Sequence, residues 1–186
     1  MADISDRKVA ILATNGFEQS ELESPLKALK DAGATVHVIA PEGGEIRGWD
    51  GDDWGDKVKV DHTLDAVKSA DYDALMLPGG QINPDILRAN PDAVSFVRAF
   101  WDAKKPIGAI CHAPWLLIEA EIIGGLNVTS YPSIRKDVEN AGGKWEDSEV
   151  VCDKALVTSR NPDDLPAFNA KLIEEIAEGK HRSRAA

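Results

Sequence analysis

Short apolar runs alternate with helical segments along this chain, and that alternation is what most constrains its fold. Residues 8–13 and 35–40 have the character of strands, and the segment 18–32 between them carries leucines at helical spacing. The apolar runs 74–77 and 107–110 are also separated by a helical segment. The apolar side chains of that segment lie on one side: Ala93, Phe96, Val97 and Phe100. Strands separated by helices predict a parallel sheet covered by helices, a fold of the α/β class.

The C-terminal part of the chain predicts a β-hairpin followed by a helix. Two apolar runs, 149–152 and 155–158, are separated by two polar residues. Asp163 or Asp164 is expected to cap a helix that continues to about residue 178. The sequence therefore predicts that an antiparallel strand pair and one more covering helix follow the parallel strands.

The length of the chain suits one domain. With 186 residues and 43% apolar content, it is long enough for one well-buried core and too short for two domains of ordinary size. We expect a single domain over residues 1–186, with an ordered core of about 7–176 and a frayed basic tail over 180–186.

The charge balance restricts the partners. The net charge is −11 and the sequence pI is about 4.8, which disfavours binding to a nucleic-acid scaffold or to an anionic membrane. The first residues lack the apolar core of a signal peptide, and no later apolar stretch approaches the ~18 residues of a membrane span. The expected localisation is cytoplasmic.

Metal and disulfide sites are not expected. The only two cysteines, Cys111 and Cys152, are far apart in sequence, and Cys152 is interpreted as a buried strand residue. The four histidines lack metal-ligand spacing. The acidic segment 50–56 resembles the start of a calcium loop, but Trp54 occupies a ligand position. A solvated acidic hairpin anchored by tryptophans explains this segment better.

The segment that carries chemistry is the turn at Cys111. This cysteine follows the buried run 107–110, and Pro114 then begins a helix, so Cys111 falls on a strand-to-helix turn. Such a turn projects its side chain from the sheet, and the N–H groups of the next helix favour a thiolate. Cysteine is often an inert core residue, but the turn and the adjacent His112 favour a nucleophile.

Two other strand ends are expected to meet Cys111, because ligands bind at the carboxyl ends of parallel strands. One contributes Glu18 and Glu21, spaced so that one carboxyl can face the pocket, and the other contributes Gly79 and Gly80, whose N–H groups can approach an oxyanion. Taken singly, these residues also fit ordinary roles, as acidic residues at a helix start and as a Pro-Gly-Gly turn.

Four segments, in order and at similar spacing, resemble the PfpI family. This family belongs to the class I glutamine-amidotransferase-like superfamily and is related to the parkinsonism-associated deglycase. The segments are 15–22, 77–80, 109–114 and 129–132. The resemblance covers about residues 7–176 and implies a flavodoxin-like three-layer α/β/α sandwich, with a mostly parallel central sheet and a nucleophile elbow.

The resemblance implies a role for individual residues. Cys111 matches the family nucleophile, Glu21 the carboxyl that hydrogen-bonds its sulfur, and His112 the catalytic histidine of the protease-type branch. Gly80 and His112 match oxyanion donors through their backbone N–H groups. Further pocket positions are matched by Glu18 and Tyr131. No cofactor and no metal is implied.

The resemblance also implies assembly. In the PfpI branch a Glu just after the Pro-Gly-Gly turn of a neighbouring subunit orients the catalytic histidine. Asp85 stands at that place here, so the carboxylate is retained on a side chain one methylene shorter. We therefore expect the chain to associate with itself, as at least a homodimer, with Asp85 acting in trans and Trp115 near the interface.

The implied function is that of a stress-protective cysteine-dependent hydrolase. Glycated or aldehyde-modified substrates are favoured, with deglycase or glyoxalase-like chemistry on small carbonyl adducts. An intracellular cysteine peptidase is the alternative. A non-enzymatic oxidative-stress sensor or chaperone that uses Cys111 is an alternative of a different class.

The expected electrostatics of the site follow from placing a carboxyl against a thiol. Two adjacent negative charges are costly, so we expect Glu21 to be protonated near neutral pH and the pKa of Cys111 to be lowered. Oxidation at Cys111 is then expected to precede oxidation at Cys152.

Overall fold

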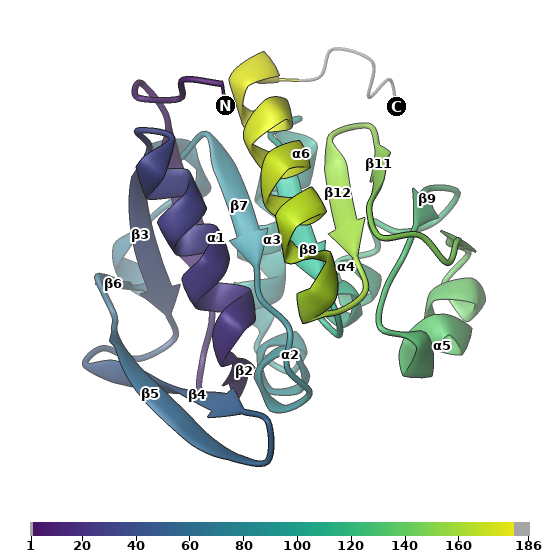
Figure 1. Cartoon of the computed structure of the whole chain (residues 1–186), viewed down its shortest axis with the longest axis horizontal. Helices are drawn as coiled ribbons and strands as arrows, with labels where there is room; N and C mark the ends of the chain where they lie inside the picture. Colours follow the sequence, from purple (N-terminus) through teal and green to yellow (C-terminus); the bar gives the residue numbers. More distant parts are fainter. Residues whose placement is uncertain (1, 181–186) are drawn as a thin grey trace.

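The computed structural model describes residues 2–180, and its centre is a seven-stranded sheet (Figure 1). From edge to edge the strands are β11 (Val151–Asp153), β12 (Leu156–Ser159), β8 (Ile107–Ile110), β7 (Ala74–Leu77), β1 (Lys8–Leu12), β3 (Thr35–Ala40) and β6 (His62–Thr63). All neighbouring strands pair in parallel except β11 and β12. The predicted mostly parallel sheet is confirmed.

Helices cover both faces of this sheet. The helices α1 (Gln19–Asp31) and α6 (Leu165–Glu178) lie side by side on one face, where Val9 and Ile11 of β1 point. The opposite face receives Ala10 and Leu12 and is covered by α3 (Pro91–Asp102) and α4 (Pro114–Glu119). Successive side chains of β1 thus enter different cores. The result is the expected three-layer α/β/α arrangement.

Smaller elements surround the sandwich. These are the helices α2 (Ile82–Arg88) and α5 (Arg135–Asn140), the parallel pair β9 (Asn127–Val128) and β10 (Lys144–Trp145), and a three-stranded sheet of β2 (Phe17–Glu18), β4 (Glu45–Asp50) and β5 (Asp53–Lys59). Short 3-10 turns occur at Leu64–Ala66, Ser69–Asp71, Pro132–Ile134 and Pro162–Asp164.

The acidic segment 50–56 is the hairpin that its sequence predicts. It joins β4 to β5, and the rings of Trp49 and Trp54 meet edge to face with centroids 5.6 Å apart. Trp54 remains 40% exposed. Because β2 pairs with β4, the hairpin is attached directly to the segment that carries Glu18.

The C-terminal predictions are confirmed except for two details. The hairpin β11–β12 forms, but Cys152 is exposed and not buried, since β11 is an edge strand and its neighbours on the chain, Val151 and Asp153, point the other way. Asp164 occupies the N-cap position of α6 without a capping hydrogen bond, because Arg160 holds its carboxylate. Residues 181–186 of the expected tail lie outside the described residues.

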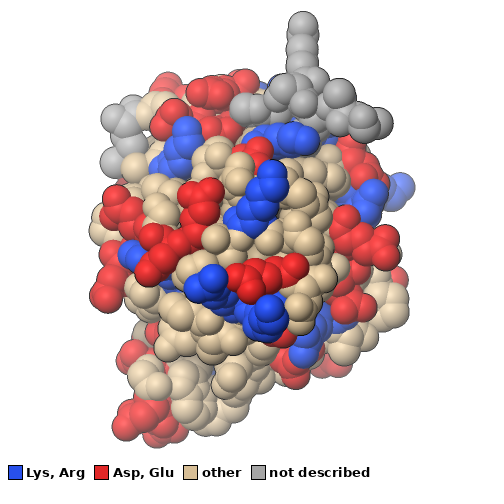
Figure 2. All heavy atoms as spheres, turned by 90° about the vertical axis from the view of Figure 1, so that its right-hand side faces the viewer, with Lys and Arg blue, Asp and Glu red and all other residues tan. Residues whose placement is uncertain are grey.

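The surface carries charges of both signs. On the face shown in Figure 2, lysine and arginine side chains are interspersed with aspartate and glutamate side chains. Within residues 2–180, no helix combines the length and the apolar character that crossing a membrane requires.

A positive backbone angle at the end of α3 generates a stability prediction. Lys104 follows the C-cap residue Ala103 with φ of 60°. A side chain there is strained by ~1 kcal/mol relative to glycine. Lys104→Gly is therefore expected to raise the free energy of unfolding by about 1 kcal/mol in urea titrations. The matched control Lys27→Gly, at an exposed position inside α1, is expected to lower it by about 1 kcal/mol. Equal effects of the two substitutions would show that the backbone at Lys104 is not strained.

Candidate active site

Cys111 lies on the turn between β8 and α4, as its sequence predicts. Its φ of +64° is unusual for a residue other than glycine and marks a sharp change of chain direction. The turn is held on both sides, since the N–H of Cys111 donates to the carbonyl of Ser159 at 3.0 Å and its own carbonyl accepts from the N–H of Tyr131 at 2.8 Å. The residue is 6% exposed. These hydrogen bonds to neighbouring segments of the same chain therefore stabilise the strained backbone conformation of Cys111.

The three expected strand ends meet at this thiol. Glu21, in the first turn of α1, is fully buried, and its Oε2 accepts a hydrogen bond from the N–H of Gly79 at 2.9 Å. A Cβ at position 79 would lie 2.5 Å from Oε2 of Glu21 and 2.6 Å from Cβ of Cys111. Only glycine fits between the acid and the cysteine, which explains the first glycine of the Pro-Gly-Gly turn.

Gly80 lies beside the sulfur in a left-handed conformation, with φ of +76°. A Cβ there would lie 2.5 Å from the carbonyl oxygen of Gly16, so this position also requires glycine. The backbone N–H groups of Gly80 and His112 both donate toward the Cys111 sulfur. Both N–H groups lower the pKa of the Cys111 thiol, which is the effect expected of donors near a sulfur anion.

The electrostatics of the pair agree with one expectation and correct the other. Burial raises the pKa of Glu21 to about 8, so this carboxyl is mostly protonated at neutral pH, as predicted. The expected lowering for Cys111 is wrong in direction. Burial and the nearby Glu21 carboxylate raise the pKa of the thiol, and the two N–H groups offset only part of that rise. Enclosure of the sulfur outweighs the field of α4, a helix of 6 residues.

His112 contacts the thiol through its side chain. Its Nδ1 lies 3.1 Å from Sγ of Cys111, and its Nε2 lies 3.2 Å from Oγ of Ser133. The ring of Tyr131 stacks on the imidazole with centroids 4.8 Å apart and an angle of 24°. Burial lowers the pKa of His112, which keeps the imidazole neutral near pH 7. A neutral imidazole whose Nε2 bears the proton and donates to Ser133 offers an unprotonated Nδ1 to the thiol.

Ser133 is the site residue that the sequence did not reveal. It follows the segment 129–132 that carries the family resemblance, but it is separated from His112 by 21 residues, and no local pattern predicts their contact. Only the 3-10 turn Pro132–Ile134 places its hydroxyl against the imidazole.

Asp85 does not reach His112 within one chain. It lies on α2, where its Oδ1 accepts from Nε and Nη2 of Arg88 at 3.0 and 2.7 Å. Its side chain is 57% exposed. Arg88 in turn stacks on the ring of Trp115, with the guanidinium carbon 4.5 Å from the ring centroid. A role for Asp85 at His112 therefore requires a second subunit.

Glu18 lies at the edge of the site. It is the N-cap residue of α1, and its partly buried carboxyl accepts a hydrogen bond from Ser20 at 3.5 Å. Burial and the charge of Asp50 raise its pKa, and its own charge contributes to the raised pKa of Glu21. The structure thus brings Glu18, Glu21, Gly80, Cys111, His112 and Tyr131 together, as expected.

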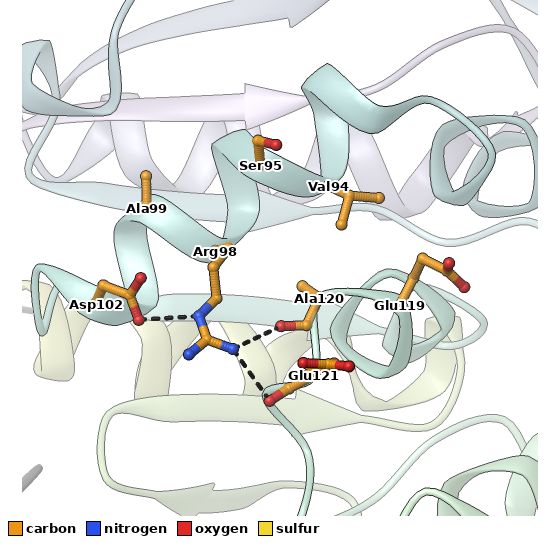
Figure 3. A pocket seen from close by; sticks show the side chains of 8 residues that line it. All are labelled: Val94, Ser95, Arg98, Ala99, Asp102, Glu119, Ala120 and Glu121. Atoms are coloured by element: carbon orange, nitrogen blue, oxygen red, sulfur yellow. Dashed lines mark hydrogen bonds and ion pairs between the residues drawn. The ribbon is translucent and has the colours of Figure 1, made fainter. Parts of the chain in front are cut away.

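A surface hollow lies between α3 and the end of α4 and is lined by residues other than those around Cys111 (Figure 3). There Arg98 donates to Asp102 at 2.9 Å and to the carbonyls of Ala120 and Glu121 at 3.1 and 3.4 Å. A cation at the C-terminal end of a helix is stabilising, so Arg98 supports the helix that follows Cys111. None of the expected site residues lines this hollow.

The comparison with known proteins agrees with this geometry. Residues 7–175 match the DJ-1/PfpI family, which covers both the sheet and all the strand ends that form the site. The chain belongs to the DJ-1/PfpI family. Its resemblance to PfpI proteins at the four segments is thereby confirmed.

Curated relatives in the DJ-1/PfpI family carry several names. General stress protein 18 of Bacillus subtilis is 49% identical over 169 residues, which are 90% of this chain and 96% of that protein. The putative cysteine protease YraA of Bacillus subtilis is 46% identical over 168 residues, with the same coverage. The protein/nucleic acid deglycase 2 of Escherichia coli is 45% identical over 169 residues, again with 90% and 96% covered.

Solved structures of DJ-1/PfpI proteins share the fold. A two-domain protein of Anabaena variabilis, with DJ-1/ThiJ/PfpI-like and ferritin-like domains, matches with a TM-score of 0.87 and 32% identity, over 97% of this chain and 52% of that chain. DJ-1beta of Drosophila melanogaster matches with a TM-score of 0.82 and 28% identity, over 95% and 91%.

The buried carboxyl makes stability depend on pH. The raised pKa of Glu21 means that the folded chain keeps a proton that the unfolded chain loses above its ordinary pKa of 4.5. The contribution of this protonated carboxyl to the free energy of unfolding is complete below pH 4.5 and is lost as pH rises toward 8. In Glu21→Gln, the decrease in unfolding free energy between pH 5 and pH 8 is expected to be smaller by on the order of 3 kcal/mol.

Urea titrations at both pH values measure this effect. Glu23→Gln, an exposed position on the same helix, is the control and is expected to retain the pH dependence of the wild type. Parallel pH profiles for the wild type and Glu21→Gln would show that Glu21 does not retain its proton.

Proposed function

We propose that this chain is a stress-protective cysteine-dependent hydrolase that acts on glycated or aldehyde-modified substrates. The observation that carries the proposal is the arrangement around Cys111: a thiol at a strained turn, a neutral imidazole 3.1 Å away and two N–H donors facing its sulfur. Relatives named as deglycases, at 41 to 45% identity, support the substrate class.

The proposed chemistry begins with proton transfer from the thiol. Because the pKa of Cys111 is raised, a base is needed, and the neutral Nδ1 of His112 is placed to accept the proton as sulfur attacks an electrophilic carbon. A C–S bond forms, and the carbonyl electron pair moves to oxygen, where the N–H groups of Gly80 and His112 stabilise it. For an amide substrate, the C–N bond then breaks as the imidazolium protonates the departing amine, and water hydrolyses the resulting thioester. For a methylglyoxal adduct, the C–N bond breaks in the same way. A proton shift from the sulfur-bearing carbon to the adjacent carbonyl carbon then converts the hemithioacetal into a lactoyl thioester, which water hydrolyses to lactate.

Glu21 has a separate task in this scheme. A protonated Glu21 adds no charge beside the sulfur, so the developing anion meets a neutral neighbour. As pH rises toward 8, ionisation of Glu21 places a negative charge next to the thiol and opposes the reaction. Glu18 and Tyr131 are proposed to contact the substrate, since both are partly exposed at the edge of this site.

A second candidate is peptide hydrolysis, which the relative named a putative cysteine protease supports. The same nucleophile and N–H groups can act on the carbonyl of a peptide bond. Peptide hydrolysis differs from adduct turnover in its leaving group and in the space that the substrate needs around Cys111. A third candidate, an oxidation sensor or chaperone without turnover, needs the thiol but neither His112 nor the N–H groups.

Purified wild type, Cys111→Ser and the control Cys152→Ser distinguish these candidates. Each protein is given methylglyoxal adducts of N-acetyl-arginine and N-acetyl-cysteine, free methylglyoxal, and short fluorogenic peptides. NMR follows both adduct loss and lactate formation. Cys111→Ser is expected to lose at least about 100-fold in adduct turnover, because the nucleophile is removed, whereas Cys152→Ser retains it. Peptide cleavage without adduct turnover would favour the peptidase. If turnover of neither substrate depends on Cys111, the sensor is favoured.

We further propose that the chain forms at least a homodimer in which Asp85 of one subunit approaches His112 of the other. Apolar side chains next to Asp85 on α2 support an interface with a second copy: Ile82 is 39% and Ile86 48% exposed. In the single chain Ser133 already partners Nε2 of His112, so Asp85 would reinforce this contact or act through it.

Sedimentation at micromolar concentration combined with three variants tests this proposal. A dimer is expected, with Asp85→Ala lowering and Asp85→Glu raising turnover, because the longer carboxylate reaches further. Ser133→Ala measures the contribution of the contact within the chain, and Asp92→Ala at an exposed position of α3 is the control. A monomer, or unchanged turnover in both Asp85 variants, would remove Asp85 from the site.

A further inference from the structure

Asn83 is fully buried beside the candidate active site and has no part in the chemistry described so far. It lies in the first turn of α2, three residues after Gly80. All the polar atoms of its side chain have partners. Its Oδ1 accepts from the N–H of Thr14 at 2.8 Å, and its Nδ2 donates to the carbonyls of Pro78 and Gly79 at 2.9 and 3.1 Å. One amide thus joins the loop after β1 to the turn after β7.

The two carbonyls that Asn83 holds belong to the peptide units whose N–H groups serve the site. A peptide unit is planar and trans, so its N–H points away from its C=O. The Pro78 carbonyl shares a unit with the N–H of Gly79, which donates to Glu21 at 2.9 Å. The Gly79 carbonyl shares a unit with the N–H of Gly80, which lowers the pKa of both the Cys111 thiol and the Glu21 carboxyl. Asn83 therefore holds, from the opposite side, both units that face the acid and the nucleophile.

We propose that Asn83 is a positioning residue that orients the N–H groups of Gly79 and Gly80 toward Glu21 and Cys111. Little else restrains these units on the carbonyl side. The N–H of Glu18 lies 3.4 Å from the Gly79 carbonyl, which is a long hydrogen bond. With φ of +76°, Gly80 also lacks the steric restriction that a side chain would impose on its backbone. Without the Asn83 amide, the Gly79 carbonyl keeps only the long bond from Glu18 among the described residues, and rotation of this peptide unit would turn that carbonyl toward the sulfur in place of the Gly80 N–H.

The consequence for turnover rests on the proposed function, but the consequence for the thiol does not. Loss of the Gly80 N–H removes one of two donors to a sulfur anion, so the thiolate becomes rarer at a given pH. The titratable groups that face the thiol are Glu21 from α1 and its own neighbour His112, with Glu18 acting through Glu21. None of these side chains is replaced in the Asn83 variants. Losing the Gly79 N–H bond would raise the pKa of Glu21 and keep it neutral, so it adds no negative charge beside the thiol.

The test uses two substitutions in a Cys152→Ser background, so that alkylation reports Cys111 alone. Asn83→Ala removes the whole amide. Asn83→Asp keeps the acceptor for Thr14 but replaces the NH₂ donor with oxygen. Asn169→Ala is the control, because Asn169 also joins two elements through its amide, with Nδ2 donating to Ser24 at 2.9 Å, but it is not among the groups that shift the pKa of Glu21 or Cys111. Thermal unfolding monitored by circular dichroism establishes that each variant is folded.

The main measurement is the rate of alkylation by iodoacetamide from pH 6 to pH 11. Both Asn83 variants are expected to react about 10-fold more slowly than the parent at pH 7 and to reach a similar rate at high pH, which indicates a raised thiol pKa. Asn169→Ala is expected to follow the parent. Folded Asn83 variants with profiles within twofold of the parent at every pH would overturn the proposal.

Turnover adds a second readout. If the proposed hydrolase activity exists, the Asn83 variants are expected to lose about 10- to 100-fold in kcat with KM changed less than threefold, since the N–H groups act on developing charge. Absence of any turnover in the wild type would refute the proposed function and leave the alkylation result to decide on Asn83.

Measurements on the wild type decide the question even if both substitutions prevent folding. Two-dimensional ¹H–¹⁵N NMR is expected to show slowly exchanging Asn83 side-chain NH₂ protons, because they are buried and donate. It is also expected to show a shift of the Gly80 amide when Cys111 is alkylated. Rapid exchange of the Asn83 amide, or a Gly80 amide that does not respond to alkylation, would overturn the proposal.

Discussion

Two acids buried against each other, the carboxyl of Glu21 and the thiol of Cys111, are the constraint on which this structure depends. Burial raises the pKa of both groups, because a charge on either is poorly solvated and a charge on both is costly. The site therefore holds at most one negative charge near neutral pH. The N–H groups around the pair favour that single charge, whereas the charge of Glu18 opposes it at Glu21.

The fold provides hydrogen-bond donors for the Glu21 carboxyl and the Cys111 thiol. Backbone N–H groups are the donors that a crowded interior can place within reach of a carboxylate or a sulfur, and they come here from Gly79, Gly80 and His112. These groups converge because parallel strands end at the same edge of the sheet, and each turn begins there. The Pro-Gly-Gly turn packs so closely on its neighbours that no side chain fits at position 79 or 80. The close packing that brings the N–H groups near Glu21 and Cys111 therefore also requires the two glycines.

The sequence indicated these elements because each has a local signal. Apolar runs of strand length, helical spacing of apolar residues and a proline after Cys111 depend on a few neighbours in the chain. The expectations that failed depend on distant neighbours. Cys152 is exposed because its strand lies at the sheet edge, and the Cys111 pKa is raised because the packed core encloses its sulfur.

What the sequence by itself determined is the class of fold and the position of Cys111 on a strand-to-helix turn, since both follow from the periodicity and turn residues of neighbouring positions. Only the tertiary structure decided which side chains complete the site. Ser133 reaches His112 across 21 residues and Asn83 reaches the N–H of Thr14 across 69 residues, because the packing of α2 and the 132–134 turn brings them there. Hydrogen bonds across such separations depend on three-dimensional position, which no pattern of neighbouring residues encodes.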